Sequence, residues 1–425
     1  MSGPSPLYAL DSAAVATPPL AGQLRVETAI IGAGFTGLSA ALHLAEAGRA
    51  VAVLDTHAPG WGASGRNGGQ VNPGLKPDPD MVAHRIGGIR GERLVEAAWN
   101  APDLVFSLVE QHAIACDAVR GGTLRAACGP GDLAGLERLA AQCTSRGMDV
   151  CLLDASGIAA RTGTTRYLGA LLDRRGGQLN PLSYARGLAK AAQGLGAQVH
   201  GQTPAVRLER DGAGWRISTP GGAIMADNVV LATNGYTGNL WPKLRQSVVP
   251  VFSAVIASAP LPDGLRRTIL SQREVLYELG EITTYYRTDA QGRLLIGGRS
   301  QLRDLAGPDS FRFLARHAEA LWPGLVGLEW QHGWNGQLAM TTDHYPHWHE
   351  PAPGMFACLG YNGRGIAMAT LMGRELSRRL QGTPSEALLL PPSPIRAIPL
   401  HRAWRVGVTA RLIYGRLRAA TSARR

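Results

Sequence analysis

The sequence is poor in cysteine, with only five in 425 residues: Cys116, Cys128, Cys143, Cys151 and Cys358. Their number is odd and none has C-x-x-C spacing, so neither a disulfide framework nor a cysteine zinc site is indicated. No apolar stretch reaches the ~20 residues of a membrane span. Residues 1–22 lack the basic segment and apolar run of a secretory signal. We therefore expect a cytoplasmic protein in a reducing compartment.

Acidic residues are fewer than basic ones, and the formal net charge is +11. Most of this charge is arginine scattered singly along the chain, without a basic block interleaved with aromatic residues before residue 400. Nucleic-acid recognition needs such a basic surface, so no nucleic-acid partner is expected. The 45% hydrophobic and 18% charged residues are typical of a globular protein. The length favours two domains.

A dinucleotide-binding pattern begins at a predicted strand, residues 26–31. The strand leads into a G-x-G-x-x-G turn and a helix, and a second strand ends at Asp55, about 20 positions later. The first glycine forms the turn, the second admits a pyrophosphate, and the third lets the helix pack on the strand. The helix N-terminus favours negative charge, and Asp55 is expected to bind the adenine ribose. The predicted cofactor contacts in the turn are Gly32, Ala33, Gly34, Phe35, Thr36 and Gly37.

A glycine-rich loop with small hydroxyl and amide side chains, residues 60–70, follows this unit. Such a loop offers many backbone N–H groups to an extended cofactor. A simple NAD dehydrogenase would continue into its next helix instead, so the loop favours a flavin over nicotinamide. The predicted contacts in this loop are Trp61, Gly62, Ala63, Ser64, Gly65, Arg66, Asn67, Gly68, Gly69 and Gln70.

The run GWGASGRNGGQ of this loop resembles the flavin-contacting loop of the D-amino-acid-oxidase (DAO) superfamily, and most closely the γ-glutamylputrescine oxidoreductase group. The resemblance continues through residues 178–181, 229–237, 334–336 and 360–366. It implies an α/β with α+β fold: a Rossmann-type FAD-binding domain of the glutathione-reductase-2 kind and an antiparallel-sheet substrate domain. The further cofactor-binding positions that it implies are Val206, Thr233, Asn234, Gly235, Tyr236, Gly336, Gly360, Tyr361, Asn362, Gly363, Gly365 and Ile366.

Two positions depart from the sarcosine oxidases of this superfamily. Those enzymes attach their flavin to a cysteine where this chain has Gly336, so non-covalent FAD is expected. They also carry a lysine where this chain has Ala367. The missing cation argues against sarcosine as the substrate and against efficient oxidase behaviour.

The resemblance implies an enzyme that oxidises a C–N bond of an amine or amino acid, in amino-acid metabolism or putrescine catabolism. A hydride would pass to flavin N5, and the imine would be hydrolysed. The electron acceptor would be oxygen, or a quinone or carrier protein. The alternatives are a nicotinamide-dependent dehydrogenase and a flavin-binding protein without turnover. No catalytic side chain is identified.

Candidate substrate contacts lie in the strand ITTYYRT, where successive side chains point to opposite faces. Only one of Tyr285 and Tyr286 can therefore line the pocket, and the resemblance favours Tyr286. Packing of both within the sheet is the alternative. Arg364 is either a partner for a substrate carboxylate or a solvated loop residue, and Trp334 is a further candidate.

The histidines near Asp343, namely His344, His347 and His349, are close enough in sequence to suggest a metal. Pro346 indicates an irregular loop there, and no metal is predicted. The predicted domain limits are an N-terminal arm (1–24), an FAD-binding domain (25–80, 150–245 and 330–387), a substrate-binding and helical domain (81–149 and 246–329), and a basic C-terminal tail (388–425).

The tail is predicted to include a basic amphipathic helix with Trp404, Val408, Leu412, Ile413 and Leu417 on its apolar side. Such a helix either folds back on the protein or lies weakly on an anionic membrane surface, which would suit electron transfer to a quinone. The protein is therefore expected to be cytoplasmic, and the second alternative adds peripheral contact at the inner membrane face.

Overall fold

The computed structural model describes residues 6–280 and 283–410, and within them the strands form two eight-stranded sheets and one two-stranded sheet. The first sheet has the order β17-β18-β11-β1-β2-β8, with β10 and β9 added beside β11. Its central strands are parallel, as expected for a nucleotide-binding fold. Its members are β1 (Gly22–Ile31), β2 (Val51–Leu54), β8 (Gln198–His200), β9 (Arg207–Asp211), β10 (Gly214–Thr219), β11 (Gly222–Leu231), β17 (His347–Ala352) and β18 (Met355–Leu359).

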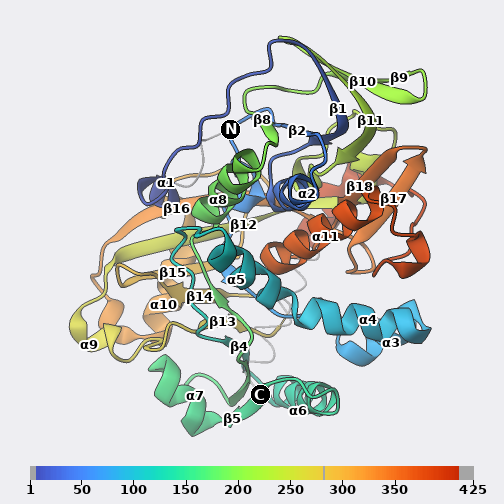
Figure 1. The fold of residues 1–425 in the computed structure, drawn as a ribbon. Helices are drawn as coiled ribbons and strands as arrows, with labels where there is room; N and C mark the ends of the chain where they lie inside the picture. Colours follow the sequence, from blue (N-terminus) through green and yellow to red (C-terminus); the bar gives the residue numbers. More distant parts are fainter. Residues whose placement is uncertain (1–5, 281–282, 411–425) are drawn as a thin grey trace.

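The last four residues of β1, Thr28 to Ile31, are buried on both faces, which suits the apolar sequence at this end of the strand. Ile30 packs into the cluster formed with the helices, whereas Ala29 and Ile31 pack into a separate cluster on the other face. The helices on the first face lie between the two large sheets (Figure 1). They are α2 (Phe35–Glu46), α5 (Ala101–Gln111), α8 (Pro181–Gly194) and α11 (Gly365–Leu380).

The second sheet has the order β16-β12-β15-β14-β13-β4-β6-β5 and is antiparallel except where β13 pairs with β4. One face is apolar and is covered by α10 (Arg312–Leu321). The opposite face carries Tyr285, Tyr277 and Trp334 among its residues. Its strands are β4 (Thr123–Ala127), β5 (Val150–Asp154), β6 (Gly169–Asp173), β12 (Val249–Pro260), β13 (Val275–Glu278), β14 (Tyr285–Thr288), β15 (Arg293–Arg299) and β16 (Trp330–Met340).

The remaining elements are short or peripheral. The two-stranded sheet pairs β3 (Gln70–Val71) with β7 (Gly177–Gln178). The other α-helices are α1 (Pro6–Leu10), α3 (Pro79–Ile86), α4 (Gly88–Trp99), α6 (Pro130–Thr144), α7 (Ala155–Thr162) and α9 (Asp263–Arg266). The 3₁₀ turns are η1 (Ala63–Gly65), η2 (Asn234–Tyr236), η3 (Leu244–Ser247), η4 (Pro308–Phe311), η5 (Pro323–Leu325), η6 (Ser385–Ala387) and η7 (His401–Ala403).

Sheet membership differs from the predicted domain limits in two places. Strands β5 and β6 fall in the range 150–245 assigned to the FAD-binding domain, and β16 falls in the range 330–387, yet all three pair in the second sheet. Helices α4 and α5 fall in the range 81–149, and α3 begins two residues before it, yet all three contribute to the apolar core of the first sheet. Short buried strands look alike in sequence, and only their long-range pairing assigns them to a sheet. The limits as a whole stay a prediction.

The N-terminal arm and the first residues of the tail pack on the body, whereas residues 404–410 are mostly exposed. The predicted N-terminal arm includes α1, where Leu7 and Tyr8 are buried. In the tail, residues 388–390 are buried and residues 404–410 are helical. The predicted apolar residues Leu412, Ile413 and Leu417 lie outside the described residues. Within the described ranges no helix is long and apolar enough to cross a bilayer.

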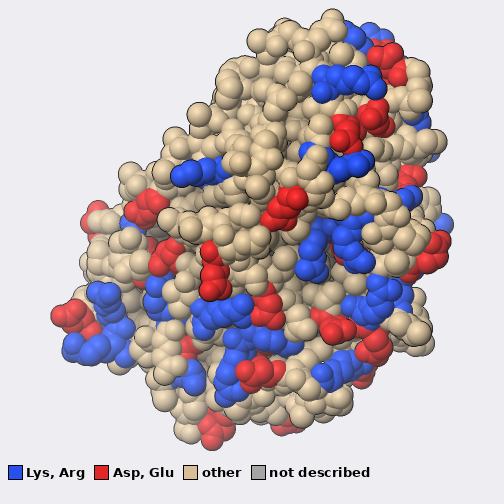
Figure 2. Space-filling view, in the orientation of Figure 1, with Lys and Arg blue, Asp and Glu red and all other residues tan. Residues whose placement is uncertain are grey.

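Basic and acidic side chains are interspersed on the face of the molecule drawn in Figure 2. The net charge of +11 is therefore not gathered into a single-sign surface on that face. An extended basic surface is the feature that nucleic-acid binding requires.

Candidate functional site

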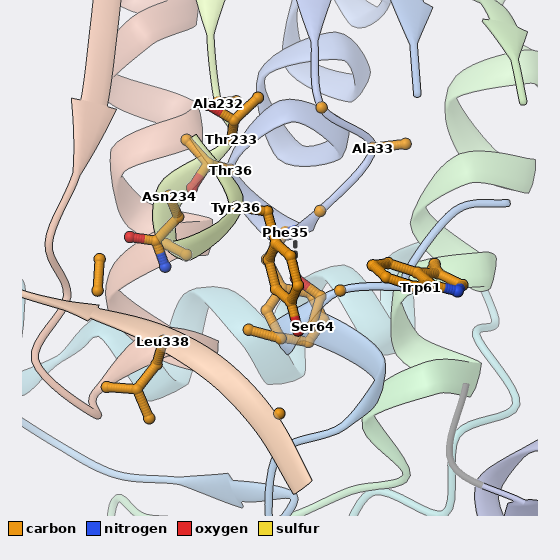
Figure 3. Close-up of a pocket in the computed structure, with 18 of the residues that line it drawn as sticks. Ala33, Phe35, Thr36, Trp61, Ser64, Ala232, Thr233, Asn234, Tyr236 and Leu338 are labelled. Carbon is orange, nitrogen blue, oxygen red and sulfur yellow. Dashed lines mark hydrogen bonds between the residues drawn. The ribbon is translucent and has the colours of Figure 1, made fainter. Parts of the chain in front are cut away.

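A cavity of ≈ 600 Å³ lies where β1, β2 and β11 end, the edge at which parallel nucleotide-binding folds hold their ligand. This volume is within the roughly 300–1,000 Å³ of cofactor sites. Figure 3 shows side chains from the first turn of α2, the loop 60–70 and the residues after β11 around it. The cavity therefore joins three of the segments that the sequence predicted to bind one cofactor.

The glycine turn has the tight geometry that its sequence predicts. Gly32 has φ +115°, and a Cβ there would lie 2.7 Å from the carbonyl oxygen of Ala232. A Cβ at Gly37 would lie 2.0 Å from the carbonyl oxygen of Gly32. The first glycine thus lets β1 turn beside β11, and the third lets α2 pack on the strand end.

The N-terminus of α2 opens onto the cavity beside Ser64. The backbone N–H of Phe35 donates to Ser64 Oγ at 3.0 Å (Figure 3). A Cβ at Gly34 would lie 2.9 Å from the same oxygen. The positive end of the helix dipole and a hydroxyl therefore face one place in the cavity, an arrangement that suits a pyrophosphate.

Asp55 connects the glycine turn with the loop that follows β2. One carboxylate oxygen accepts the N–H of Ala33 and the other accepts the N–H of His57, each at 2.8 Å. Burial raises the pKa of Asp55, and the two hydrogen bonds partly offset this effect. A carboxylate offers about four lone-pair sites, so two remain for the ribose hydroxyls of a dinucleotide.

Three aromatic rings that line the cavity contact one another in series. His57 stacks on Trp61 with ring centroids 3.8 Å apart, and Trp61 meets the edge of Tyr236 at 5.5 Å. Val206 also lines this cavity, but its N–H already donates to the carbonyl of Ser218 at 2.9 Å. The cofactor contact that the resemblance implies for the backbone of Val206 would therefore be made by its carbonyl oxygen.

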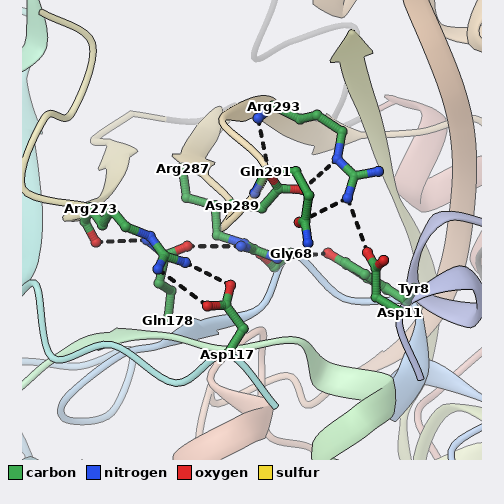
Figure 4. A network of polar contacts seen from close by, with 10 residues as sticks. All are labelled: Tyr8, Asp11, Gly68, Asp117, Gln178, Arg273, Arg287, Asp289, Gln291 and Arg293. Carbon is green, nitrogen blue, oxygen red and sulfur yellow. Dashed lines mark hydrogen bonds and ion pairs between the residues drawn. The ribbon is translucent and has the colours of Figure 1, made fainter. Parts of the chain in front are cut away.

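Three successive carbonyl groups of the loop 60–70 are held from behind by side chains. Trp334 Nε1 donates to the carbonyl of Arg66 at 2.9 Å, and Tyr8 donates to that of Asn67 at 3.0 Å. Arg287 Nε donates to the carbonyl of Gly68 at 2.6 Å (Figure 4). Side chains from the arm, β14 and β16 thus fix the peptide groups of the predicted flavin loop.

The far end of the cavity is formed by the turn before α11. Tyr361 and Thr36 share a buried hydrogen bond of 2.6 Å between their hydroxyl groups, which ties this turn to α2. Asn362 Oδ1 accepts the N–H of Thr341 at 2.9 Å. Gly363 and the first residues of α11 line the cavity, so the positive end of that helix is directed there. This is a suitable place for the negative charge of a reduced flavin.

Gly336 also lines the cavity, and a Cβ there would lie 2.9 Å from Cβ of Arg66. None of the described residues that line the cavity is a cysteine. The donors and glycines around the cavity fit an FAD that is held without a bond to cysteine.

The structure corrects the choice between the two tyrosines of β14. Tyr285 lines the cavity, and its hydroxyl lies 2.9 Å from Ser253 Oγ. Tyr286 is fully buried on the opposite face, where its hydroxyl meets that of Tyr167 at 2.8 Å. The prediction that Tyr286 lines the pocket was wrong, because pairing with β13 and β15 turns that side chain toward α10.

The other two predicted substrate residues lie beside the cavity instead of lining it. Trp334 is 3% exposed, and its ring packs against Tyr8 with centroids 5.1 Å apart. Arg364 Nη2 donates to the hydroxyl of Tyr277 at 2.7 Å, so this side chain is not a solvated loop residue. Trp334 supports the flavin loop, and Arg364 belongs to a polar cluster around Tyr277.

Most predicted cofactor residues line the cavity, and the exceptions share one property. At each exception a Cβ would come within 3 Å of another part of the chain. These positions shape the site through close packing: Gly37, Gly65, Gly69, Gly235 and Gly360. Lining residues that the sequence did not single out include Thr56, His57, Asn72, Thr203, Ser253 and Leu338. For Ser253 and Leu338, the alternation of β12 and β16 is a signal that could have found them.

The histidines near Asp343 make separate contacts. Asp343 Oδ1 lies 3.1 Å from His347 Nε2, and Asp343 Oδ2 lies 3.1 Å from Arg85. His349 Nδ1 lies 2.7 Å from the carbonyl of Ser393. Asp343 thus has protein partners for both oxygens.

Comparison with known proteins matches residues 27–379 to the family described as FAD dependent oxidoreductase. The chain is 31% identical over 372 residues to the probable oxidoreductase OrdL of Haemophilus influenzae, covering 86% of this chain and 85% of the relative. It is 30% identical over 386 residues to the gamma-glutamylputrescine oxidoreductase of Escherichia coli, covering 90% of each. The solved glycine oxidase from Geobacillus kaustophilus has a TM-score of 0.74 at 23% identity, covering 88% of this chain and 99% of that one. These matches confirm the predicted fold class.

Proposed function

Because the chain belongs to the DAO family of FAD-dependent oxidoreductases, we propose that it oxidises the C–N bond of an amine or amino acid, with γ-glutamylated diamines as the preferred substrates. The similarity to the Escherichia coli enzyme along 90% of the chain supports this substrate class. The cavity that joins the glycine turn, the loop 60–70 and the turn before α11 is the observation that carries the flavin chemistry.

FAD supplies the hydride acceptor in this proposal, and the residues of the chain bind and orient. Tyr285 and Ser253 form one polar wall of the cavity. Their linked hydroxyl groups can accept a hydrogen bond from an amine or donate one to it. Burial raises the pKa of Tyr285, so this phenol stays protonated near neutral pH. Water then hydrolyses the imine product.

A strong base is not needed if the amine binds in its neutral form. Among the described lining residues, Asp55 and His57 are the only carboxylate and the only histidine. Both lie at the glycine turn, where Asp55 holds Ala33 and His57 through their backbone N–H groups. The amine proton is therefore lost to solvent before oxidation, and the rate of flavin reduction should increase with pH toward the pKa of the substrate amine.

Anaerobic flavin reduction tests the proposed substrate class before the electron acceptor is known. The purified yellow holoenzyme is mixed without oxygen with γ-glutamylputrescine, putrescine, glycine, N-methylglycine or D-alanine, and the visible absorbance is followed. We expect γ-glutamylputrescine to bleach the flavin most rapidly. Bleaching by an amino acid but not by γ-glutamylputrescine would overturn the substrate class, and a flavin that none of them bleaches would overturn the enzyme proposal.

Oxygen or a quinone then serves as the oxidant in a second step. The reduced enzyme is mixed with air-saturated buffer or with a soluble quinone, and the return of the yellow colour is timed. We propose that the quinone or a carrier protein is the faster oxidant. This follows from Ala367, which stands where sarcosine oxidases have a lysine. Faster return of the colour in air would contradict it.

A further inference from the structure

Two arginines from distant parts of the chain meet on one tyrosine beside the cavity. Arg364, directly before α11, donates from Nη2 to the hydroxyl of Tyr277 at 2.7 Å, and its guanidinium carbon lies 4.9 Å from the ring centroid. The guanidinium carbon of Arg125, on β4, lies 5.9 Å from the centroid of the same ring. Both side chains also reach the carbonyl of Pro73, at 3.3 Å from Arg125 and 3.4 Å from Arg364. The two guanidinium groups thus share two uncharged partners, the side chain of Tyr277 and the carbonyl of Pro73.

Among residues 6–280 and 283–410, no carboxylate contacts the guanidinium groups of Arg125 and Arg364. Neither arginine forms an ion pair within 4.0 Å of the described carboxylates. Asp173, one of the nearby acids, is bound by both Nε and Nη2 of Arg175, at 2.9 and 2.7 Å. Arg125 is 5% exposed, and its Nε has no hydrogen-bond partner in the part of the chain that the structure describes. Buried charges in proteins are normally paired, so this arrangement lacks an anion.

The arginine pair lies at the edge of the flavin cavity. Tyr277 stands directly opposite Tyr285 in the pairing of β13 with β14, so both side chains project from the same face of the sheet. Asn72 lines the cavity immediately before Pro73, and Gly363 and Gly365 line it on either side of Arg364. A ligand that extends past Tyr285 toward β4 would therefore reach the two guanidinium groups.

We propose that Arg125 and Arg364 bind a carboxylate of the substrate that is remote from the C–N bond to be oxidised. The inference rests on the proposed function and narrows the substrate to amines that carry a distant negative charge. Guanidinium groups bind carboxylates through two parallel hydrogen bonds, and Arg125 Nε is a buried donor without a partner among the described residues. The positive end of α11 adds to the attraction.

Asp78 provides the competing explanation for the charge. It is close enough to influence the electrostatics, because Arg125 and Arg364 both act to lower its pKa, but burial has the larger effect and raises this pKa. If Asp78 were the intended counter-ion, the arginine pair would stabilise the fold and would bind no ligand. Direct binding of a carboxylate separates the two explanations.

The first test measures binding without turnover. Holoenzyme is titrated by isothermal calorimetry with glutarate, which has the acyl chain of a γ-glutamyl group, and with uncharged glutaramide. We expect saturable binding of glutarate and about 10- to 100-fold weaker binding of glutaramide, the loss expected for charge-assisted hydrogen bonds. Equal affinities would overturn the proposal, whether or not the enzyme oxidises γ-glutamylputrescine.

The second test places the binding site. Arg125→Gln and Arg364→Gln should each weaken glutarate binding by about tenfold or more, whereas Arg120→Gln serves as the control. Arg120 precedes the same strand and forms an exposed ion pair with Asp103. Arg125→Lys and Arg364→Lys keep the positive charge but lose the planar fork, so they should bind glutarate with an affinity between those of wild type and the Gln variants. If the Gln variants lose FAD, the Lys variants are measured in their place. Unchanged affinity in these variants would overturn the assignment.

A matched substrate pair connects the inference with catalysis. γ-Glutamylputrescine is compared with γ-aminobutyrylputrescine, which has the same amide and amine but no carboxylate. The wild-type holoenzyme and Arg120→Gln should prefer the acidic substrate in KM by about tenfold or more, and the Arg125 and Arg364 variants should lose this preference. If neither compound reduces the flavin while glutarate still binds as expected, the proposed reaction fails and the anion site stands.

Discussion

The phenol of Tyr8 donates a hydrogen bond of 3.0 Å to the backbone carbonyl of Asn67, across 59 positions of sequence. Arg287 holds the next carbonyl in the loop, that of Gly68, and its Nη2 lies 3.4 Å from the Tyr8 hydroxyl. The N-terminal arm therefore takes part in the construction of the flavin loop. A contact of this kind orders the loop before the cofactor binds, which lowers the entropic cost of binding.

Tyr8→Phe should weaken FAD binding because it removes this contact and keeps the ring that packs on Trp334. A single neutral hydrogen bond contributes about 0.5–1.5 kcal/mol, so we expect the Kd for FAD to rise roughly 2- to 12-fold. Quenching of flavin fluorescence during titration of FAD with the apoprotein measures this Kd.

Asp11→Asn is the matched control for the arm. Asp11 pairs with Arg293 at 3.0 Å, and among the described residues its hydrogen bonds go to Ser183 and Arg293 instead of to the loop 60–70. It should leave the Kd for FAD within about twofold of wild type. If both variants weaken FAD binding equally, the arm acts through general stability, and the specific role of Tyr8 is wrong.

Exchange of the two neighbouring tyrosines for phenylalanine should have separate effects. Tyr286→Phe removes the hydroxyl that meets Tyr167 in the core, and should lower the free energy of unfolding by about 1–3 kcal/mol. Tyr285→Phe removes a hydroxyl at the cavity wall, and should slow anaerobic flavin reduction with a smaller effect on stability. Thermal unfolding measures the loss of stability, and stopped-flow absorbance measures the rate of flavin reduction. A larger kinetic effect from Tyr286→Phe would mean that the wrong tyrosine has been assigned to the cavity.

These tyrosines show where inference from the sequence stops. Local patterns predicted the glycine turn, Asp55 and most of the loop 60–70, because a strand, turn and helix follow one another within 30 residues. The face of Tyr285 depends on its register with Gly297 in β15. That register is set by pairing between strands, and the alternation within ITTYYRT is equally compatible with either face.

Long-range contacts explain the other omissions. Tyr8 lies in a segment with no motif, and Arg125 is more than 200 residues from Arg364 in sequence. The five predicted glycines that do not line the cavity were recognised as part of the pattern, but their role is to permit close packing. The sequence predicted the segments that form the site better than the direction of individual side chains.

The pKa of Asp55 predicts a pH dependence for the stability of the apoprotein. Burial raises this pKa above its ordinary value, so the folded chain binds more protons than the unfolded chain between the two values. Stability from this group is therefore greatest at low pH and falls as pH rises through that window. We expect the unfolding free energy of wild type, minus that of Asp55→Asn, to decrease as pH rises from the ordinary carboxyl pKa. Denaturant unfolding of both apoproteins at several pH values measures this difference, and an increase would contradict the raised pKa.

Gly37→Ala should damage the site by overpacking, since its Cβ would lie 2.0 Å from the carbonyl oxygen of Gly32. The obstacle is backbone, so α2 must move away from the end of β1. We expect a loss of about 1–3 kcal/mol in the free energy of unfolding and a large loss of bound FAD, measured as the ratio of absorbance at the flavin band to that of the protein. Gly135→Ala is the control, because this glycine lies within α6 and its Cβ would meet only Arg138 at 3.9 Å. That substitution should be neutral or stabilise by up to about 1 kcal/mol. If Gly37→Ala retained full FAD content and stability, close packing of α2 on β1 would not be what requires glycine at this position.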